Sequence, residues 1–345
     1  MATIVGGLGT SHSPQLSMPG STWSERAEWD RTTTLFSFAD AATRAPAGIL
    51  DEITEQAFEA NHARCQAAIT RLHELLVGHA PDVVVVVGDD QNEMFLDDGY
   101  PAVAILRADT LIDAPRPLDS LHPSSRRAEW AYHGTEAVER PGAPELAWHI
   151  VAHLSQSGFD VTQLARQPEG RSLGHAFTFV QRRLMGDHIV PVVPIMINTD
   201  HAPNIPTPRR CLEIGAELRA AIDSWDSDQR VLLVASGGLS HFEVDAVLDR
   251  HVLDAIGERD HEALANLPVE RLVLGTAEIR NWIIVAAALA DGYEFNLIDY
   301  VAAYRSEAAT GCGMGFAEWR AADHPCRTNG TPHHEQQHDT DKEQS

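Results

Sequence analysis

Five consecutive valines at residues 83–87 constrain the fold of this chain more than any other feature. β-Branched residues favour strands, and a run without apolar–polar alternation is typical of a strand buried on both faces of a parallel sheet. Pro81 ends a helical pattern over 51–79 just before this run, and polar residues starting at Gly88 follow it. The run therefore predicts a parallel strand of an α/β sheet that helices cover on both sides.

Other segments continue this alternation of strands and helices. Further strands are predicted at 3–9, 102–106, 189–197 and 230–235, and further helices at 144–157, 210–225 and 276–289. Pro191 and Pro194 predict that the 189–197 strand lies at an edge of the sheet or contains a bulge. We expect one catalytic α/β domain over 1–320, with a central mixed sheet flanked by helices, and a polar, disordered tail over 321–345. The irregular segments 20–50 and 109–143 are candidates for a lid.

The charge of the chain argues against two classes of partner. Lys and Arg total 26 against 50 Asp and Glu, which gives a formal net charge of −24. Nucleic acids and anionic membrane surfaces need clustered cations, so neither is an expected partner. Lys342 is the only lysine, which excludes Schiff-base chemistry in the body of the chain. The first residues do not have a signal-peptide pattern and the cysteines have no C-x-x-C spacing, so we expect a cytoplasmic protein with reduced thiols and no membrane segment.

Polar residues that could bind a metal follow several of the predicted strands. His12 follows the first strand, the polar segment 89–93 follows the valines, and His241 follows the strand at 230–235, while Glu278 lies near the start of the last helix. Open α/β sheets bind ligands at the carboxyl ends of their strands, so these side chains could converge on one cation. Histidine and carboxylate ligands with open positions suit a non-haem Fe(II) site that activates dioxygen. The alternative is that a histidine at a strand end is only a hydrogen-bonded loop residue.

Six segments, in order along the chain, resemble the class III extradiol dioxygenase catalytic subunits, a superfamily that includes the protocatechuate 4,5-dioxygenase β subunit and the gallate dioxygenases. They are Thr10-Ser11-His12-Ser13-Pro14-Gln15-Leu16, residues 81–91, residues 145–150, Gly174-His175, Ser236-Gly237-Gly238-Leu239-Ser240-His241 and Ala277-Glu278-Ile279-Arg280-Asn281-Trp282. Residues 18–30 and 204–211 are most similar to the 3-O-methylgallate dioxygenase branch. The resemblance implies the same α/β architecture and a homodimer. No fused small α-type domain is apparent in the sequence, so a small α-type partner subunit is possible but not expected.

The resemblance also implies roles for individual residues. His12 and Glu278 match the iron-binding histidine and glutamate. His241 matches the catalytic histidine that acts as acid and base, and His175 matches a second histidine that faces the substrate. Both could instead be hydrogen-bonded polar residues without a catalytic role. Separately, an arginine of the 109–143 segment, Arg126 or Arg127, is expected to bind a substrate carboxylate.

The second histidine ligand of the family is missing from its expected place. Where the protocatechuate enzymes have asparagine-aspartate-histidine, this chain has Asp89-Asp90-Gln91. Gln91 offers a neutral carbonyl oxygen, which is a harder and weaker ligand for Fe(II) than imidazole. Asp90 and Glu93 are alternative oxygen ligands, and His62 on the preceding helix is a further substitute. A weak ligand set lowers metal affinity, so an inactive, metal-free relative stays an alternative.

The function that these residues and the resemblance predict is Fe(II)-dependent extradiol cleavage of a catechol-type ring. The expected substrates are O2 and a methoxylated or carboxylated catechol similar to 3-O-methylgallate, gallate or protocatechuate. No dinucleotide fingerprint, P-loop or G-x-S-x-G elbow is present, which fits a reaction that needs no external reductant. The alternatives are a hydrolase or lyase that uses Zn(II) or Mn(II) on the same scaffold, and a metal-free binding subunit.

Overall fold

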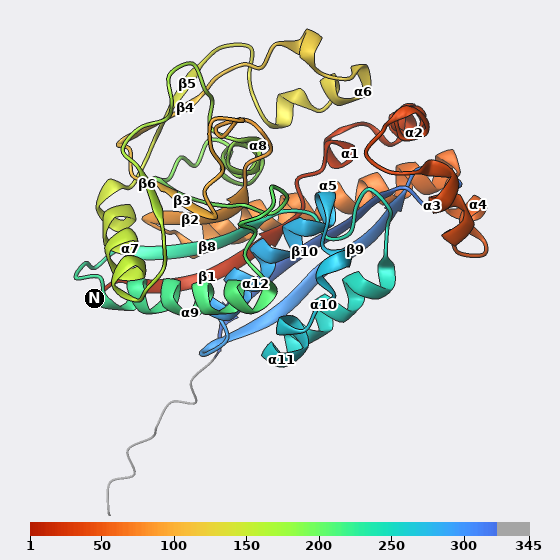
Figure 1. Ribbon diagram of the computed structural model, residues 1–345. Helices are drawn as coiled ribbons and strands as arrows, with labels where there is room; N and C mark the ends of the chain where they lie inside the picture. Colours follow the sequence, from red (N-terminus) through yellow and green to blue (C-terminus); the bar gives the residue numbers. More distant parts are fainter. Residues whose placement is uncertain (323–345) are drawn as a thin grey trace, which may run out of the picture.

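An eight-stranded mixed sheet is the centre of the molecule (Figure 1). The computed structural model describes residues 1–322, and the predicted disorder of the C-terminal tail falls almost entirely outside the described residues. The strands of the large sheet are β1 (Thr3–Thr10), β2 (Val83–Asp89), β3 (Val103–Leu106), β6 (Thr162–Leu164), β7 (Val192–Ile197), β8 (Arg230–Ser236), β9 (Tyr293–Tyr304) and β10 (Gly311–Ala321). A separate two-stranded sheet pairs β4 (Thr110–Asp113) with β5 (Val138–Pro141).

The middle of the large sheet is parallel and its sides contain antiparallel pairs. The strand order is β6-β3-β7-β2-β8-β1-β10-β9. Strands β7, β2, β8 and β1 run parallel to one another, β10 and β9 follow as an antiparallel pair, and β3 is antiparallel to β7. This arrangement confirms the predicted mixed sheet, and its parallel centre confirms the prediction from the five valines.

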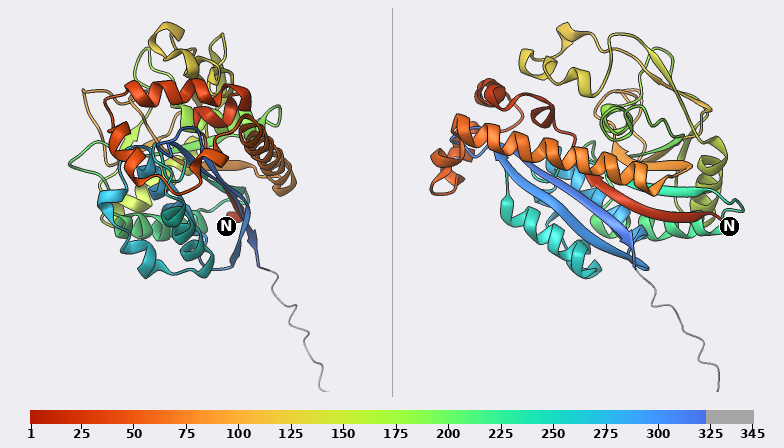
Figure 2. Two further views of the ribbon diagram at one scale, coloured as in Figure 1. Left: turned by 90° about the vertical axis from the view of Figure 1, so that its right-hand side faces the viewer. Right: turned by 180° about the vertical axis from the view of Figure 1, so that it is seen from behind.

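Helices cover both faces of this sheet. The long helix α5 (Glu55–His79) lies across one face, together with α8 (His175–Phe179) and the π-helical η4 (Val180–Met185) (Figure 2). Helices α7 (Pro144–Gln156), α9 (Pro208–Ser224), α10 (Ala246–Glu258) and α12 (Ile279–Ala288) cover the other. The shorter helices are α1 (Pro14–Ser17), α2 (Trp23–Thr32), α3 (Phe38–Arg44), α4 (Ile49–Glu52), α6 (Pro123–Arg126) and α11 (His261–Ala265), with 3-10 turns η1 (Gly20–Thr22), η2 (Leu118–Ser120), η3 (Glu129–Ala131), η5 (Val269–Arg271) and η6 (Leu274–Glu278).

The valines of β2 contribute to both hydrophobic cores, one on each face of the sheet. Val83, Val85 and Val87 pack in the core on the α9 and α12 side, whereas Val84 and Val86 pack in the core on the α5 side. Successive side chains of a strand point to opposite faces, so a central strand between two helical layers needs an apolar residue at every position. Asp89 ends this strand and continues the alternation toward the α12 side.

Three local predictions were wrong. Strand β7 is an internal strand without a bulge. It tolerates Pro194 because this residue pairs with β2 on one side and lies just beyond the last residue that pairs with β3 on the other. The 20–50 segment, which was expected to be irregular, is largely helical. The buried stripe of α2 mixes Trp23 and Ala27 with Arg26 and Asp30, which hides its helical period. The 109–143 segment contains the β4–β5 sheet and α6.

The β9–β10 pair was not predicted at all. Glycines alternate along β10 at Gly311, Gly313 and Gly315, and glycine is depleted in strands. A Cβ atom on Gly313 would lie 1.9 Å from Oδ2 of Asp249, so the strand needs glycine where α10 approaches it. The glycine at position 313 is therefore explained by packing against α10 and not by strand propensity.

Helix α12 sits very close to the sheet because glycine faces it. A Cβ atom on Gly9 of β1 would lie 2.5 Å from the ring of Trp282, which is fully buried. The indole Nε1 of Trp282 donates a hydrogen bond of 2.9 Å to the carbonyl of Gly237, just after β8. These contacts fix the start of α12 against the carboxyl ends of β1 and β8.

Two further observations concern cysteines and membranes. Cys65, Cys211 and Cys312 are buried free thiols, and Cys326 lies outside the described residues. Within residues 1–322, no helix combines the length and apolar character needed to cross a membrane.

We expect Gly215→Ala to destabilise the fold. A Cβ atom there would lie 2.2 Å from the carbonyl oxygen of Ile284, so α9 and α12 would have to separate. Overpacking of this kind costs about 1–3 kcal/mol, more than the ~1 kcal/mol that alanine gains over glycine inside a helix. Denaturant unfolding would measure the change. The matched control is Gly78→Ala in α5, where an added Cβ meets nothing within 4 Å and stability should stay the same or rise. Equal stability of the two variants would contradict the close α9–α12 packing.

Candidate metal centre

Three strand ends meet at one edge of the sheet. Because β8 pairs in parallel with both β1 and β2, their carboxyl ends lie side by side. His12 follows β1 by two residues, Asp89 is the last residue of β2 and Ser236 is the last residue of β8. Glu278 reaches the same edge from η6, at the start of α12.

His12, Asp89 and Glu278 form a buried cluster at this edge. One possible ligand atom from each residue lies within 4.8 Å of those of the other two. His12 Nε2 and Glu278 Oε2 are 3.6 Å apart. The exposed fractions are 2% for His12 and 1% for both acidic residues, so the cluster is removed from bulk water.

A hydrogen-bond chain fixes the tautomer of His12. The hydroxyl of Ser236 donates to the carbonyl of Ala176 at 2.6 Å and lies 3.0 Å from His12 Nδ1. A hydroxyl has one proton, so Ser236 must accept from Nδ1–H. The lone pair of Nε2 then faces Glu278, which is the arrangement of a metal-ligating histidine with a hydrogen-bonded second nitrogen.

The turn after β8 fixes Glu278. The backbone N–H of Gly238 donates to Glu278 Oε2. One turn further along α12, the amide of Asn281 donates to the carbonyl of Ser236 at 3.0 Å. Gly237 allows this close approach of the turn to Glu278, since a Cβ atom there would lie 3.0 Å from Cβ of Glu278.

Gln91 lies at the cluster and binds both carboxylates. Its amide nitrogen donates to Asp89 Oδ2 at 3.0 Å and to Glu278 Oε1 at 2.7 Å. The amide nitrogen, and not the carbonyl oxygen, therefore faces the cluster. The sequence prediction named Gln91 and left out Asp89, although the position of Asp89 as the last residue of a buried parallel strand could have identified it.

The cluster has more negative than positive charge. Burial and the charge of Glu278 raise the pKa of Asp89 to about 7. For Glu278, burial acts to raise the pKa, but the nearby His12 and His241 outweigh it and hold the pKa at about 2. For His12, burial acts to lower the pKa, but Glu278 outweighs it and raises the pKa. The raised pKa of Asp89 reflects its repulsion by Glu278, and a divalent cation would relieve that repulsion.

The other candidate substitutes for the missing histidine face elsewhere. Asp90 accepts hydrogen bonds from the backbone N–H groups of Glu93, Met94 and Phe95. His62 packs edge-on against Trp23, with ring centroids 6.5 Å apart.

Glu93 holds His175 instead of facing the cluster. Its Oε2 lies 2.9 Å from His175 Nδ1 and accepts from the backbone N–H of His175 at 2.7 Å. Arg116 donates to Oε1 at 2.8 Å and also pairs with Glu129. The ring of His175 contacts that of His12 edge-on, with centroids 4.7 Å apart. Arg116 is thus the arginine of the 109–143 segment that reaches the site, through Glu93 and His175.

Arg126 and Arg127 have partners away from the cluster. Arg127 forms an ion pair with Glu25 on α2, with 3.0 Å between its Nε and Oε2 of Glu25. Arg126 donates to the carbonyl of Leu121 and lies 3.8 Å from Asp119. Within residues 1–322, neither forms a hydrogen bond or ion pair with His12, Asp89 or Glu278.

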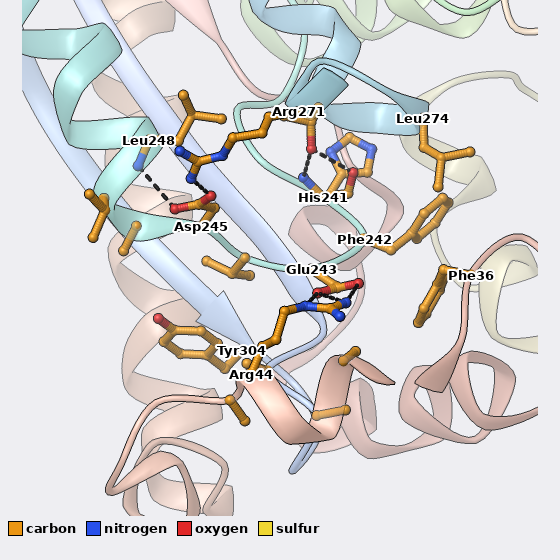
Figure 3. Close-up of a pocket in the computed structure, with 18 of the residues that line it drawn as sticks. Phe36, Arg44, His241, Phe242, Glu243, Asp245, Leu248, Arg271, Leu274 and Tyr304 are labelled. Carbon is orange, nitrogen blue, oxygen red and sulfur yellow. Dashed lines mark hydrogen bonds and ion pairs between the residues drawn. The ribbon is translucent and has the colours of Figure 1, made fainter. Parts of the chain in front are cut away.

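His241 joins the cluster to a cavity. Its Nε2 is 3.8 Å from Glu278 Oε1, and burial lowers its pKa. Thr276 fixes its backbone, since the N–H of His241 donates to the threonine hydroxyl at 2.9 Å. The cavity has a volume of about 620 Å³ and is also lined by Phe36 and Arg44 of the 20–50 segment (Figure 3).

The cluster fits a divalent metal ion. His12 Nε2 and Asp89 Oδ1 are both buried without a hydrogen-bond partner among the described residues, which is costly unless a ligand binds them. One imidazole and two carboxylates form a nitrogen and oxygen donor set that suits Fe(II), Mn(II) or Zn(II). Fold and site together define an α/β protein with a buried histidine–carboxylate centre at the carboxyl ends of its strands.

Comparison with known proteins gives the family. Residues 51–313 match the family described as the catalytic LigB subunit of aromatic ring-opening dioxygenase. This match covers more than half of the chain, so the chain belongs to that family. The family confirms the resemblance inferred from the sequence segments.

The individual relatives match shorter parts of the chain or match it at low sequence identity. A gallate dioxygenase of Pseudomonas putida is 37% identical over 103 residues, which is 29% of each chain. A 2,3-dihydroxyphenylpropionate/2,3-dihydroxicinnamic acid 1,2-dioxygenase of Photorhabdus laumondii is 28% identical over 185 residues, which is 53% of this chain and 50% of the relative. The matched part therefore spans half or less of the length of these two relatives. A solved structure of an uncharacterized protein of Escherichia coli K12 is 17% identical with a TM-score of 0.44, and covers 72% of this chain and 91% of that one.

We expect Ser236→Ala to lower the free energy of unfolding by about 1–3 kcal/mol. The substitution leaves Nδ1–H of His12 and the carbonyl of Ala176 buried without their shared partner. Urea unfolding would measure the difference. The exposed Ser21 is the control, and Ser21→Ala should change stability by less than about 0.5 kcal/mol. If Ser236→Ala is equally neutral, Ser236 does not fix the tautomer of His12.

Proposed function

We propose that the chain is a non-haem Fe(II)-dependent extradiol dioxygenase that inserts both atoms of O2 into a catechol-type ring and opens it. The observation that carries the proposal is the buried cluster with an unpartnered imidazole nitrogen and an unpartnered carboxylate oxygen. The family supports the class of reaction. Both oxygen atoms enter the product, so the reaction needs no external reductant.

His12 and Glu278 would hold the iron, with a further contact from the Asp89–Gln91 pair. Bound Fe(II) would supply a site for the two catechol oxygens and for O2, and a path for electrons between them. Ser236 keeps the lone pair of His12 Nε2 aimed at the ion, and Gly238 and Gln91 orient the carboxylate of Glu278. Gln91 can either remain a hydrogen-bond donor to the carboxylates or present its oxygen to the ion after its amide rotates.

His241 would move the proton. Burial lowers its pKa, so the imidazole is neutral near pH 7 and can accept a proton from a catechol hydroxyl. The same group can return a proton to an oxygen atom as the ring opens. Its contact with Glu278 and its place in the cavity lining support a role beside a ring that binds at the cluster.

His175 would face the substrate beside His12, whose ring it contacts edge-on. The carboxylate of Glu93 accepts from Nδ1–H of His175, so Nε2 remains free to interact with a bound oxygen atom. Burial acts to raise the pKa of Glu93, but His175 and Arg116 outweigh it and hold the pKa at about 2. Glu93 therefore stays ionised and keeps the ring in place.

The proposal is tested by metal content and turnover on the same preparations. Protein loaded with Fe(II) without air should bind about one iron per chain, consume oxygen with catechols and form a yellow product. His12→Ala and Glu278→Ala should lose the iron, because each removes a ligand. His241→Gln should keep the iron and lose about 10²–10⁴-fold in kcat, the range of a general acid–base group.

The exposed His251 of α10 provides the control, and His251→Gln should keep both iron and turnover. Loss of iron in His241→Gln would make His241 a ligand, and full turnover would make it structural. Failure to cleave gallate, 3-O-methylgallate, protocatechuate and uncharged catechols would refute the dioxygenase. In that case Zn(II) or Mn(II) in the purified protein would favour a hydrolase or lyase. The absence of any metal would favour a non-catalytic subunit.

A further inference from the structure

The cavity beside His241 is larger than a simple catechol requires. A cavity of about 150 Å³ is enough to bind benzene, and the cavity here has a volume of about 620 Å³. His241, which lies 3.8 Å from Glu278, lines this cavity together with Thr276, whereas His12, Asp89 and Glu278 are not part of its lining. A ring bound beside His241 therefore leaves most of this volume for a substituent.

Apolar and aromatic side chains form much of the cavity wall. The rings of Phe36 and Phe242 are nearly parallel, at an interplanar angle of 15° with centroids 5.8 Å apart, and both line the cavity (Figure 3). Leu274 and Tyr304 line it at other positions. Aromatic rings bind other aromatic groups through stacked or edge-on contacts, so this wall suits a second ring.

The charged residues of the cavity do not favour a carboxylate. Arg44 binds Glu243 through two nitrogen atoms, with 2.6 Å between Nη2 and Oε1. Arg271 forms an ion pair with Asp245 (Figure 3). Glu270 adds a third acidic residue to the lining, so the described lining has two arginines, both paired, against three carboxylates. An anionic substituent would meet no unpaired cation there and a net negative charge.

We propose that the substrate is a catechol with an extended, uncharged substituent, such as a second aromatic ring, which occupies the cavity beside His241. This inference rests on the proposed ring cleavage and narrows its substrate. It departs from the carboxylated substrates that the sequence resemblance suggests. The 20–50 segment then determines specificity, since Phe36, Arg44 and Ala45 belong to it and close one side of the cavity.

The test compares matched catechols with the iron-loaded protein. The uncharged pair is 3-phenylcatechol and 4-phenylcatechol, and the charged set is their 4′-carboxylates with protocatechuate. We expect kcat/KM for a phenylcatechol to exceed that for protocatechuate by about 10–100-fold, the gain that burial of a phenyl-sized apolar group gives. It should also exceed kcat/KM for the 4′-carboxylates, because these place a negative charge in a cavity without an unpaired cation. Binding of the same compounds without oxygen should follow the same order.

Two variants test whether this cavity is responsible. Ala45→Phe fills the cavity and should remove most of the preference for phenylcatechols, whereas Ala47→Phe, two residues away, exposed and outside the lining, should keep it. Glu243→Gln releases Arg44 from its partner, and should raise kcat/KM for the carboxylated biaryls several-fold relative to the uncharged ones.

The outcomes separate the substrate inference from the reaction. A preference of the unmodified protein for protocatechuate or the 4′-carboxylates overturns the inference and leaves the dioxygenase intact. An equal loss of preference in Ala45→Phe and Ala47→Phe also overturns it. If no catechol is cleaved, the proposed function fails, and the binding order without oxygen still decides whether the cavity favours uncharged biaryls.

Discussion

The parallel pairing of β8 with β1 on one side and β2 on the other is the constraint on which the site depends. It places the ends of three strands together, and with them His12, Asp89 and Ser236. Helix α12 adds Glu278 because Trp282 packs on the glycine surface of β1 and bonds to the turn after β8. The buried valines of β2 anchor the central strand in both cores, so the site is attached to the most buried part of the fold.

Within this frame, the unbalanced charge of the cluster determines what it can do. Two carboxylates and one imidazole are buried together, and a hydroxyl, a backbone N–H and an amide orient them. Burying unpaired charge is unfavourable, and a divalent cation offsets it at the point where the strand ends converge. His241 and His175 border the same centre from two sides, and each is held by contacts of its own, Thr276 for one and Glu93 for the other.

The sequence predicted the sheet centre, because a run of valines has few alternatives to a doubly covered strand. It failed at β7, where Pro194 is tolerated because β3 ends beside it, and at β10, where Gly313 is required by the approach of α10. For the candidate site, the strand-end rule brought together His12, the segment 89–93, His241 and Glu278. The narrower ligand set of His12, Gln91 and Glu278 followed the family resemblance and left out Asp89, although Asp89 is the last residue of the buried strand β2. Arg116 rather than Arg126 or Arg127 reaches the site through Glu93, which only the tertiary contacts reveal.

Anomalous diffraction at the iron edge, from crystals grown with Fe(II) in the absence of oxygen, tests the central claim most directly. The account predicts one peak about 2.0–2.2 Å from His12 Nε2 and from a carboxylate oxygen of Glu278, distances usual for first-row divalent ions. A third contact from Asp89 Oδ1 or from the amide oxygen of Gln91 would settle which of the two completes the ligand set. A map without a peak between these residues, or with iron bound elsewhere, would contradict the account.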